Sequence, residues 1–108
     1  MQAKKYIDLR IEPCDGTHAL ASKAVKALTG ELLKNGYHAE IAPSHPLVHV
    51  LLVDHGEELF AAASVSGSLA SGMRQAHGFV RIGKHAEAVA MNLVFDIIAV
   101  LPKFVVGT

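Results

Sequence analysis

The chain has 108 residues, of which 51% are hydrophobic, and its ten basic and ten acidic residues cancel. This hydrophobic content excludes intrinsic disorder over most of the length, and the length predicts a single domain, residues 1–108. Because nucleic-acid binders usually carry a net positive charge, zero net charge disfavours a nucleic-acid partner. The single cysteine, Cys14, cannot form an internal disulfide. We therefore expect a reducing compartment and a cytoplasmic protein.

The first elements are a strand and a helix. Residues 6–12 alternate between apolar and polar side chains, which predicts a half-buried strand. Asp15 or Thr17 is expected to cap the helix that follows. An apolar stripe continues this helix as far as Asn35-Gly36, a pair that typically ends a helix.

The middle of the chain predicts further extended segments. Residues 37–42 look extended, and residues 48–53 are almost continuously apolar, as in a strand covered on both faces. Residues 59–65 are expected to return as an antiparallel partner in a hairpin. The Gly- and Ser-rich stretch that follows predicts a connection with a short helix around residues 69–76 and a short strand at residues 79–82.

Residues 86–101 predict a helix that is apolar on nearly every side. At about 100° per residue, His85, Asn92 and Asp96 fall on one narrow stripe, and the other sides need cover. We expect a homo-oligomer with this helix at or near the interface. The alternative is a helix packed between the sheet and the first helix or the 67–82 segment. The stretch is shorter than the roughly 20 residues that span a bilayer, so we expect no membrane association.

The order of elements predicts an α+β fold. We expect a two-layer sandwich with a mainly antiparallel sheet and two main helices on one face. A ferredoxin-like arrangement is the expected topology, although the 67–82 segment does not fit it neatly. Residues 104–106 are expected to form a last edge strand.

A candidate ligand site lies in the Gly- and Ser-rich stretch and consists of Gly67, Ser68, Gly72 and Arg74. Glycines allow backbone N–H groups to point at an anion, and arginine adds charge and a fork of donors. The stretch predicts contact with a small anionic ligand. The alternative is a plain connection, since neither a P-loop nor a dinucleotide-binding glycine pattern is present.

Three histidines, His49, His55 and His77, are candidates to join this site, because imidazole suits acid–base chemistry near neutral pH. The spacing of His45, His49 and His55 does not predict a metal site, since no cysteine pair and no HExxH sequence accompanies them. We expect neither a metal nor a cofactor.

The sequence favours a small α+β module that acts by association, or by binding a ligand or partner. The alternative is a small oligomeric enzyme with a site between subunits that uses histidines and Arg74. No residue has a pattern that assigns it a catalytic role.

Overall fold

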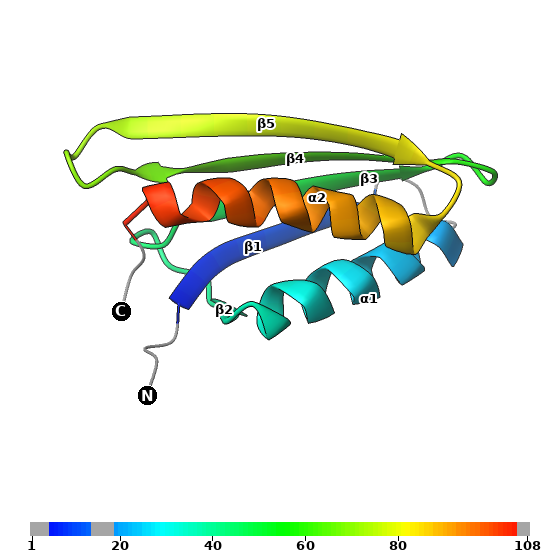
Figure 1. Ribbon diagram of the computed structural model, residues 1–108, viewed down its shortest axis with the longest axis horizontal. Coiled ribbons are helices and arrows are strands. Elements are labelled where there is room, and N and C mark those ends of the chain that lie inside the picture. Colours follow the sequence, from blue (N-terminus) through cyan, green and yellow to red (C-terminus); the bar gives the residue numbers. More distant parts are fainter. Residues whose placement is uncertain (1–4, 14–18, 106–108) are drawn as a thin grey trace.

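The chain folds into a five-stranded sheet with two helices packed against one face (Figure 1). A computed structural model describes residues 5–13 and 19–105. The elements are, in chain order, β1 (Lys5–Pro13), α1 (Ala19–Lys34), β2 (Tyr37–Ala39), β3 (Leu47–Asp54), β4 (Leu59–Ser68), β5 (Arg74–Gly83), α2 (Ala86–Val100) and a short 3-10 helix (Leu101–Lys103).

The sheet is mixed, with the strand order β2-β1-β3-β4-β5. β1 pairs in parallel with both β2 and β3, whereas β3, β4 and β5 form an antiparallel meander. The predicted α+β class and the two helices against a sheet are confirmed. The sheet is only partly antiparallel, and the ferredoxin-like order is not confirmed, because the chain crosses from β2 over β1 to reach β3.

The β4–β5 hairpin differs from the prediction. Its register is unbroken from Leu59 opposite Gly83 to Ser68 opposite Arg74. The helix predicted around residues 69–76 is therefore wrong, and the strand predicted at 79–82 is the second half of a strand of 10 residues. The turn between the strands uses Gly72, whose φ of 90° lies in the region that favours glycine.

The core lies between the sheet and the helices. Alternate side chains of β3 and β4 point into it, including Val48, Val50 and Leu52, which are at most 1% exposed. α2 is covered on one side by the sheet and on another by α1. The alternative expectation, a helix packed between the sheet and the first helix, thus accounts for much of the burial of the apolar side chains of α2. Phe95 of α2 points outward and is 61% exposed, and the oligomer expected through residues 86–101 stays a prediction.

The N-terminus of α1 is held from the far end of β3. The Oδ2 atom of Asp54 accepts hydrogen bonds from the backbone N–H of Leu20 at 3.1 Å and of Ala21 at 3.4 Å. A carboxylate at this position satisfies otherwise unpaired N–H groups and complements the helix dipole. The caps predicted at Asp15 and Thr17 lie outside the described residues, as does Cys14.

The C-terminal segment touches the end of β4. Phe104 forms a single antiparallel bridge with Leu69, and the N–H of Val105 donates to the Ser68 carbonyl at 2.8 Å. The strand predicted at residues 104–106 is thus represented by one bridge within the described residues, and its last residue lies outside them.

Candidate functional site

The face of the sheet opposite the helices carries side chains that neither helix covers, and we call it the open face (Figure 1). Its membership follows from the alternation of burial along β3 and β4 and from the register of the ladders. Its central members are Asp8, Arg10 and Glu12 of β1; Leu47, His49, Leu51 and Val53 of β3; Phe60, Ala62, Ser64, Ser66 and Ser68 of β4; and Arg74, Ala76, Gly78, Val80 and Ile82 of β5.

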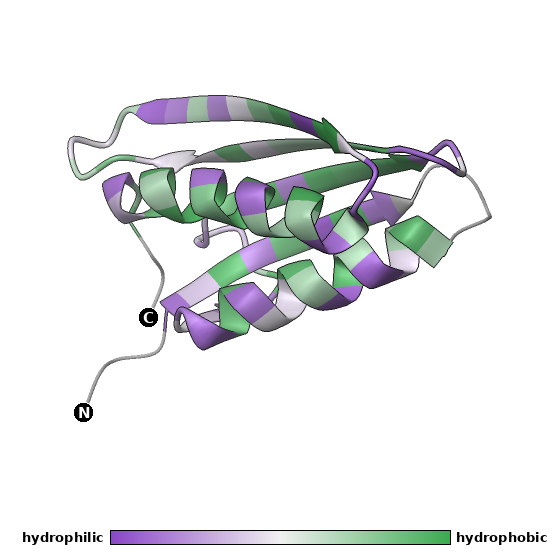
Figure 2. Cartoon of the chain, turned by 45° about the vertical axis from the view of Figure 1, so that its right-hand side comes forward, coloured by the Kyte–Doolittle hydropathy of each residue, from purple (hydrophilic) through white to green (hydrophobic). Residues whose placement is uncertain are grey.

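One end of the open face is apolar. We call it the apolar patch, and it consists of Leu51, Val53, Phe60, Ala62, Val80 and Ile82, which are neighbours in register. Val80 is 58% exposed and Ile82 is 56% exposed, both on the outermost strand. β4 changes from hydrophobic at its start to near-neutral at its end, so the patch is confined to one end (Figure 2). Clustered exposed apolar side chains usually mark an interaction surface.

The rest of the open face carries charged pairs. Arg10 donates hydrogen bonds from Nε and Nη2 to the two carboxylate oxygens of Asp8, at 3.2 and 3.1 Å. These hydrogen bonds, and then the charge of Asp8, raise the pKa of the Arg10 guanidinium. Asp8 is itself only 5% exposed, so Arg10 supplies the charge that a buried carboxylate needs.

A second acid–base pair joins β1 to β3. The Nε2 atom of His49 lies 3.4 Å from Oε2 of Glu12. Ser64 of β4 lies directly across from His49 in register, which brings a hydroxyl next to the imidazole on the surface of the sheet. We use the name polar band for these side chains of the open face: Asp8, Arg10, Glu12, His49 and Ser64.

The loop between β2 and β3, residues 40–46, crosses β1 next to the polar band. His45 stacks on Tyr6 with ring centroids 5.6 Å apart, and its Nε2 atom lies 3.1 Å from Oε1 of Glu40. The His45 side chain is only 4% exposed, and its Nδ1 atom is buried without a hydrogen-bond partner in the structure. The stacked ring fixes the crossing of the loop over the first strand.

The four residues of the predicted ligand site lie at one end of the β4–β5 hairpin. Arg74 is paired with Ser68, and its Nη1 donates to the Ser68 hydroxyl at 3.3 Å. Gly67 faces the helical side, where a Cβ would lie 3.1 Å from Cδ1 of Phe104, so its role in the structure is close packing. Gly72 serves the turn. The structure brings Ser68 and Arg74 together and turns Gly67 away from them.

The three candidate histidines do not converge within one chain. His49 lies on the open face, whereas His77 contacts Phe104 on the helical side, at a centroid distance of 6.1 Å. His55 lies in the β3–β4 turn, and β4, a strand of 10 residues, separates it from Arg74. Such a strand is about 30 Å long. Among the described residues, no group of three or more metal-binding side chains comes together.

Sequence reasoning missed the shortest ion pair among the described residues. Arg81 of β5 donates from Nε and Nη2 to the two oxygens of Asp96 of α2, both at 2.8 Å. The sequence places Asp96 on a polar stripe with His85 and Asn92. In the structure Asp96 points to β5, and His85 lies before the first residue of α2. The pairing depends on the register of β5, and no local sequence signal reveals it.

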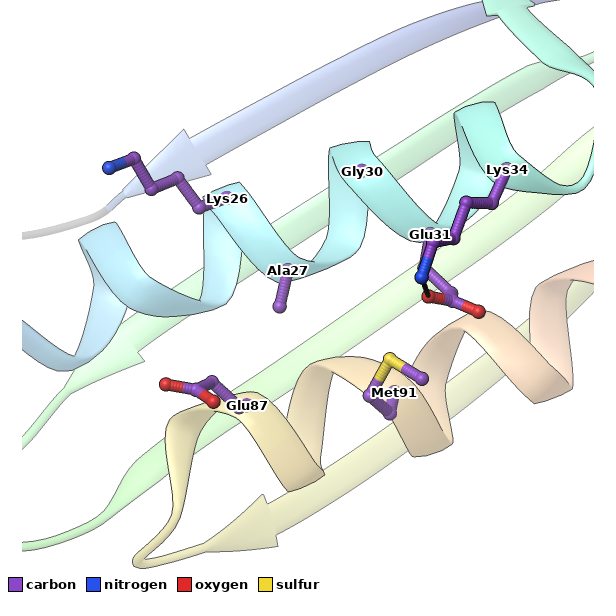
Figure 3. Close-up of a pocket in the computed structure, with 7 residues that line it drawn as sticks. All are labelled: Lys26, Ala27, Gly30, Glu31, Lys34, Glu87 and Met91. Carbon is purple, nitrogen blue, oxygen red and sulfur yellow. Dashed lines mark ion pairs between the residues drawn. The ribbon is translucent and has the colours of Figure 1, made fainter.

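A shallow groove of about 300 Å³ runs between the two helices (Figure 3). Lys26, Ala27, Gly30, Glu31 and Lys34 come from α1, and Glu87 and Met91 come from α2. Its charges are mixed, and Lys34 lies 4.0 Å from Glu31 of the same helix. The groove therefore offers neither a uniform charge nor an enclosed apolar floor to a ligand.

No protein-family model matches this chain, and no curated protein matches it. Within the part of the chain that the structure describes, no helix has the length and apolar character required to cross a bilayer. The functional inference accordingly depends on the surfaces described above.

Proposed function

We propose that this chain is a small α+β module that works by self-association rather than by catalysis. The observation that carries the proposal is the apolar patch on the open face. Two of its side chains, Val80 and Ile82 of the outermost strand, are more than half exposed. Removing such side chains from water contributes about 25 cal/mol per Å² of apolar area, which favours burial against another chain.

The charge distribution also supports association. The polar band and the apolar patch lie side by side on one face, where Glu12 is opposite Leu51 in register, so a partner is oriented as well as held. The sequence also predicts a contact between chains through residues 86–101. This contact has less support, because α1 and the sheet already cover two sides of α2. Its outward side keeps Phe95 as the largest exposed side chain.

The alternative is a small oligomeric enzyme whose site uses histidines and Arg74. Its support is the Glu12–His49 pair beside Ser64. Against it, His55 and Arg74 lie at opposite ends of the hairpin, so only a second chain brings them together. The support for a small anionic ligand is the exposed guanidinium of Arg74, which already donates a hydrogen bond to Ser68.

Light scattering on the full chain at micromolar concentration tests the proposal. We expect at least twice the 11.5 kDa mass of one chain, with the mass falling on dilution. A mass of one chain throughout the series overturns self-association. A parallel measurement at high salt separates apolar contacts, which persist, from exposed ion pairs, which weaken.

A further inference from the structure

We infer that β5 pairs edge to edge with β5 of a second copy, in antiparallel orientation, so that two five-stranded sheets become one. The inference rests on the proposed self-association and names the surface that performs it. The feature that carries it is a long outer strand whose inner charge, Arg81, is already held by Asp96 of its own chain.

β5 lacks the usual protection of a sheet edge. It has 10 residues, like its neighbour β4, and its pairing with β4 contains no bulge and no proline. The opposite edge, β2, has only 3 residues. Natural sheets protect long edges with bulges, proline, free charges or short strands, because unpaired N–H and C=O groups attract other strands. Among the described residues, no strand occupies the outer side of β5.

The two charged residues of β5 do not guard it. Arg74 is its first residue and lies at the end of the strand. Arg81 lies further inside, but both of its hydrogen-bonded nitrogens point to Asp96. The pair is neutral as a unit, so an approaching strand meets little net charge. Meanwhile Val80 and Ile82 expose more than half of their surface on this same strand.

The register follows from the residue that lies opposite Arg81. Two registers give the longest overlap, one with Gly78 opposite itself and the other with Phe79 opposite itself. The second places His77 opposite Arg81 of the second copy, although the His77 ring already lies edge-on to Phe104 of its own chain. The first places Arg81 opposite Gln75 of the second copy, which accepts hydrogen bonds. The dimer axis therefore passes through Gly78.

This register also gives the two exposed apolar side chains of β5 neighbours on the second strand. Val80 lies opposite Ala76 of the second copy, and Ile82 lies opposite the alkyl stem of Arg74 of the second copy. Gly78 adds no side chain at the axis, so the two strands approach without a clash there.

Edge pairing also brings the two α2 helices together. α2 packs over β4 and β5, and strands lie about 4.8 Å apart, so the two helix axes are about 10 Å apart across the dimer axis. This is a packing distance for helices. The side of α2 turned to the axis carries Asn92 and Asp96, because Glu87 and Met91 on the other side face α1 (Figure 3). The polar stripe becomes a seam between the copies.

The polar band argues against the competing arrangement, in which two open faces stack. Stacking would remove the exposed side chains of Arg10, Glu12 and His49 from water, and buried charges are costly without well-formed pairs. Edge pairing leaves the side chains of Arg10, Glu12 and His49 exposed to water. The occupant of the β5 edge is therefore a second copy, joined by backbone hydrogen bonds.

Disulfide trapping tests the register. In a Cys14→Ser background, Gly78→Cys is oxidised under mild conditions and run on a non-reducing gel. We expect a covalent dimer, because opposed residues of an antiparallel pair lie within disulfide distance. Ser64→Cys is the matched control, since Ser64 neighbours Gly78 one strand further in. Edge pairing leaves the two Ser64→Cys thiols about 14 Å apart, whereas stacked faces bring them together.

A second test introduces a charged side chain at the interface and needs no cross-linking. Val80→Lys should raise the dimer dissociation constant at least about tenfold in a light-scattering dilution series. Leu33→Lys, on α1 and 56% exposed, should leave it unchanged. Circular dichroism verifies that both variants are folded.

The outcomes separate the two proposals. Cross-linking at Ser64→Cys but not at Gly78→Cys, or an oligomer that Val80→Lys does not weaken, overturns edge pairing and leaves self-association standing. A single-chain mass for the unmodified protein overturns both.

Discussion

Arg81 and Asp96 form a two-pronged ion pair that ties the outermost strand to the last helix, with both N–O distances at 2.8 Å. The hydrogen bonds and then the charge of Asp96 raise the pKa of Arg81. The side chains are 44% and 21% exposed, so solvent screens the pair only in part. The geometry makes it worth more than a typical surface pair, and water still limits its contribution.

Replacing Arg81 by Met should lower the free energy of unfolding, because the carboxylate of Asp96 loses its partner. Urea denaturation measures the loss, and a double-mutant cycle with Asp96→Asn isolates the pair energy. Lys34→Met is the control, since Lys34 lies 4.0 Å from Glu31 and is mostly exposed, and it should change stability little. Equal losses in both variants would contradict a special role for the Arg81–Asp96 geometry.

Two neighbouring residues of α2 should respond very differently to truncation. Leu93 is fully buried and Phe95 is 61% exposed. Leu93→Ala should cost about 2–5 kcal/mol, because it leaves a cavity between α2 and the sheet. Phe95→Ala should change the stability by less than about 0.5 kcal/mol. Thermal or urea unfolding of both variants checks the prediction, and a large loss for Phe95→Ala would mean that α2 is covered on its outward side.

Asp54→Ala should destabilise the protein by about 1–2 kcal/mol, because the first N–H groups of α1 lose an acceptor. Asp54→Asn keeps an acceptor oxygen and should cost less. Urea denaturation gives the free energies, and hydrogen exchange at Leu20 and Ala21 locates the effect. Equal losses for the two variants would mean that the negative charge, rather than the hydrogen bonds, stabilises the helix.

Tyr37 should make the protein less stable in alkali. Burial raises the pKa of Tyr37 above its ordinary value of 10.0, because the phenolate is poorly solvated in the fold. The folded state therefore binds the phenolic proton more tightly than the unfolded state above about pH 10, and stability falls as the pH rises further. Tyr37→Phe should flatten this decline in urea midpoints measured between about pH 9.5 and about pH 11. An unchanged slope would assign the decline to other groups.

The parts of the fold that sequence predicts well have strong local patterns. The strand at residues 6–12 alternates cleanly, and the first helix and the apolar helix both lie where the sequence places them. The second half of the hairpin was missed for a physical reason. Ser64, Ser66 and Ser68 alternate with core positions on β4, and Gly78 lies opposite Ser64 on β5. The sequence predicts a loop here because small residues are typical of loops. In the structure these residues lie on the open face, where no helix covers them and no large apolar side chains are needed.

The order of the sheet and the candidate site were harder to predict, because both depend on register. Parallel pairing of β1 with β2 and β3 requires the crossing loop, whose path depends on contacts such as the His45–Tyr6 stack that no local sequence pattern reveals. Likewise, Arg81 and Asp96 meet because β5 and α2 run in opposite directions over one another. The sequence predicts His85, Asn92 and Asp96 on one helix face, and only the fold shows that Asp96 points to β5.

The position of β1 between two later strands governs the order in which this chain can fold. β3, β4, β5 and α2 contact their neighbours in sequence, so they can assemble through short loops. β1 must wait, since its longest pairing joins Asp8 to Leu47 and continues as far as Pro13 opposite Leu52. Closing such a distant pairing is slower than closing a hairpin. We therefore expect β1, the first of the described strands along the chain, to be among the last to enter the sheet.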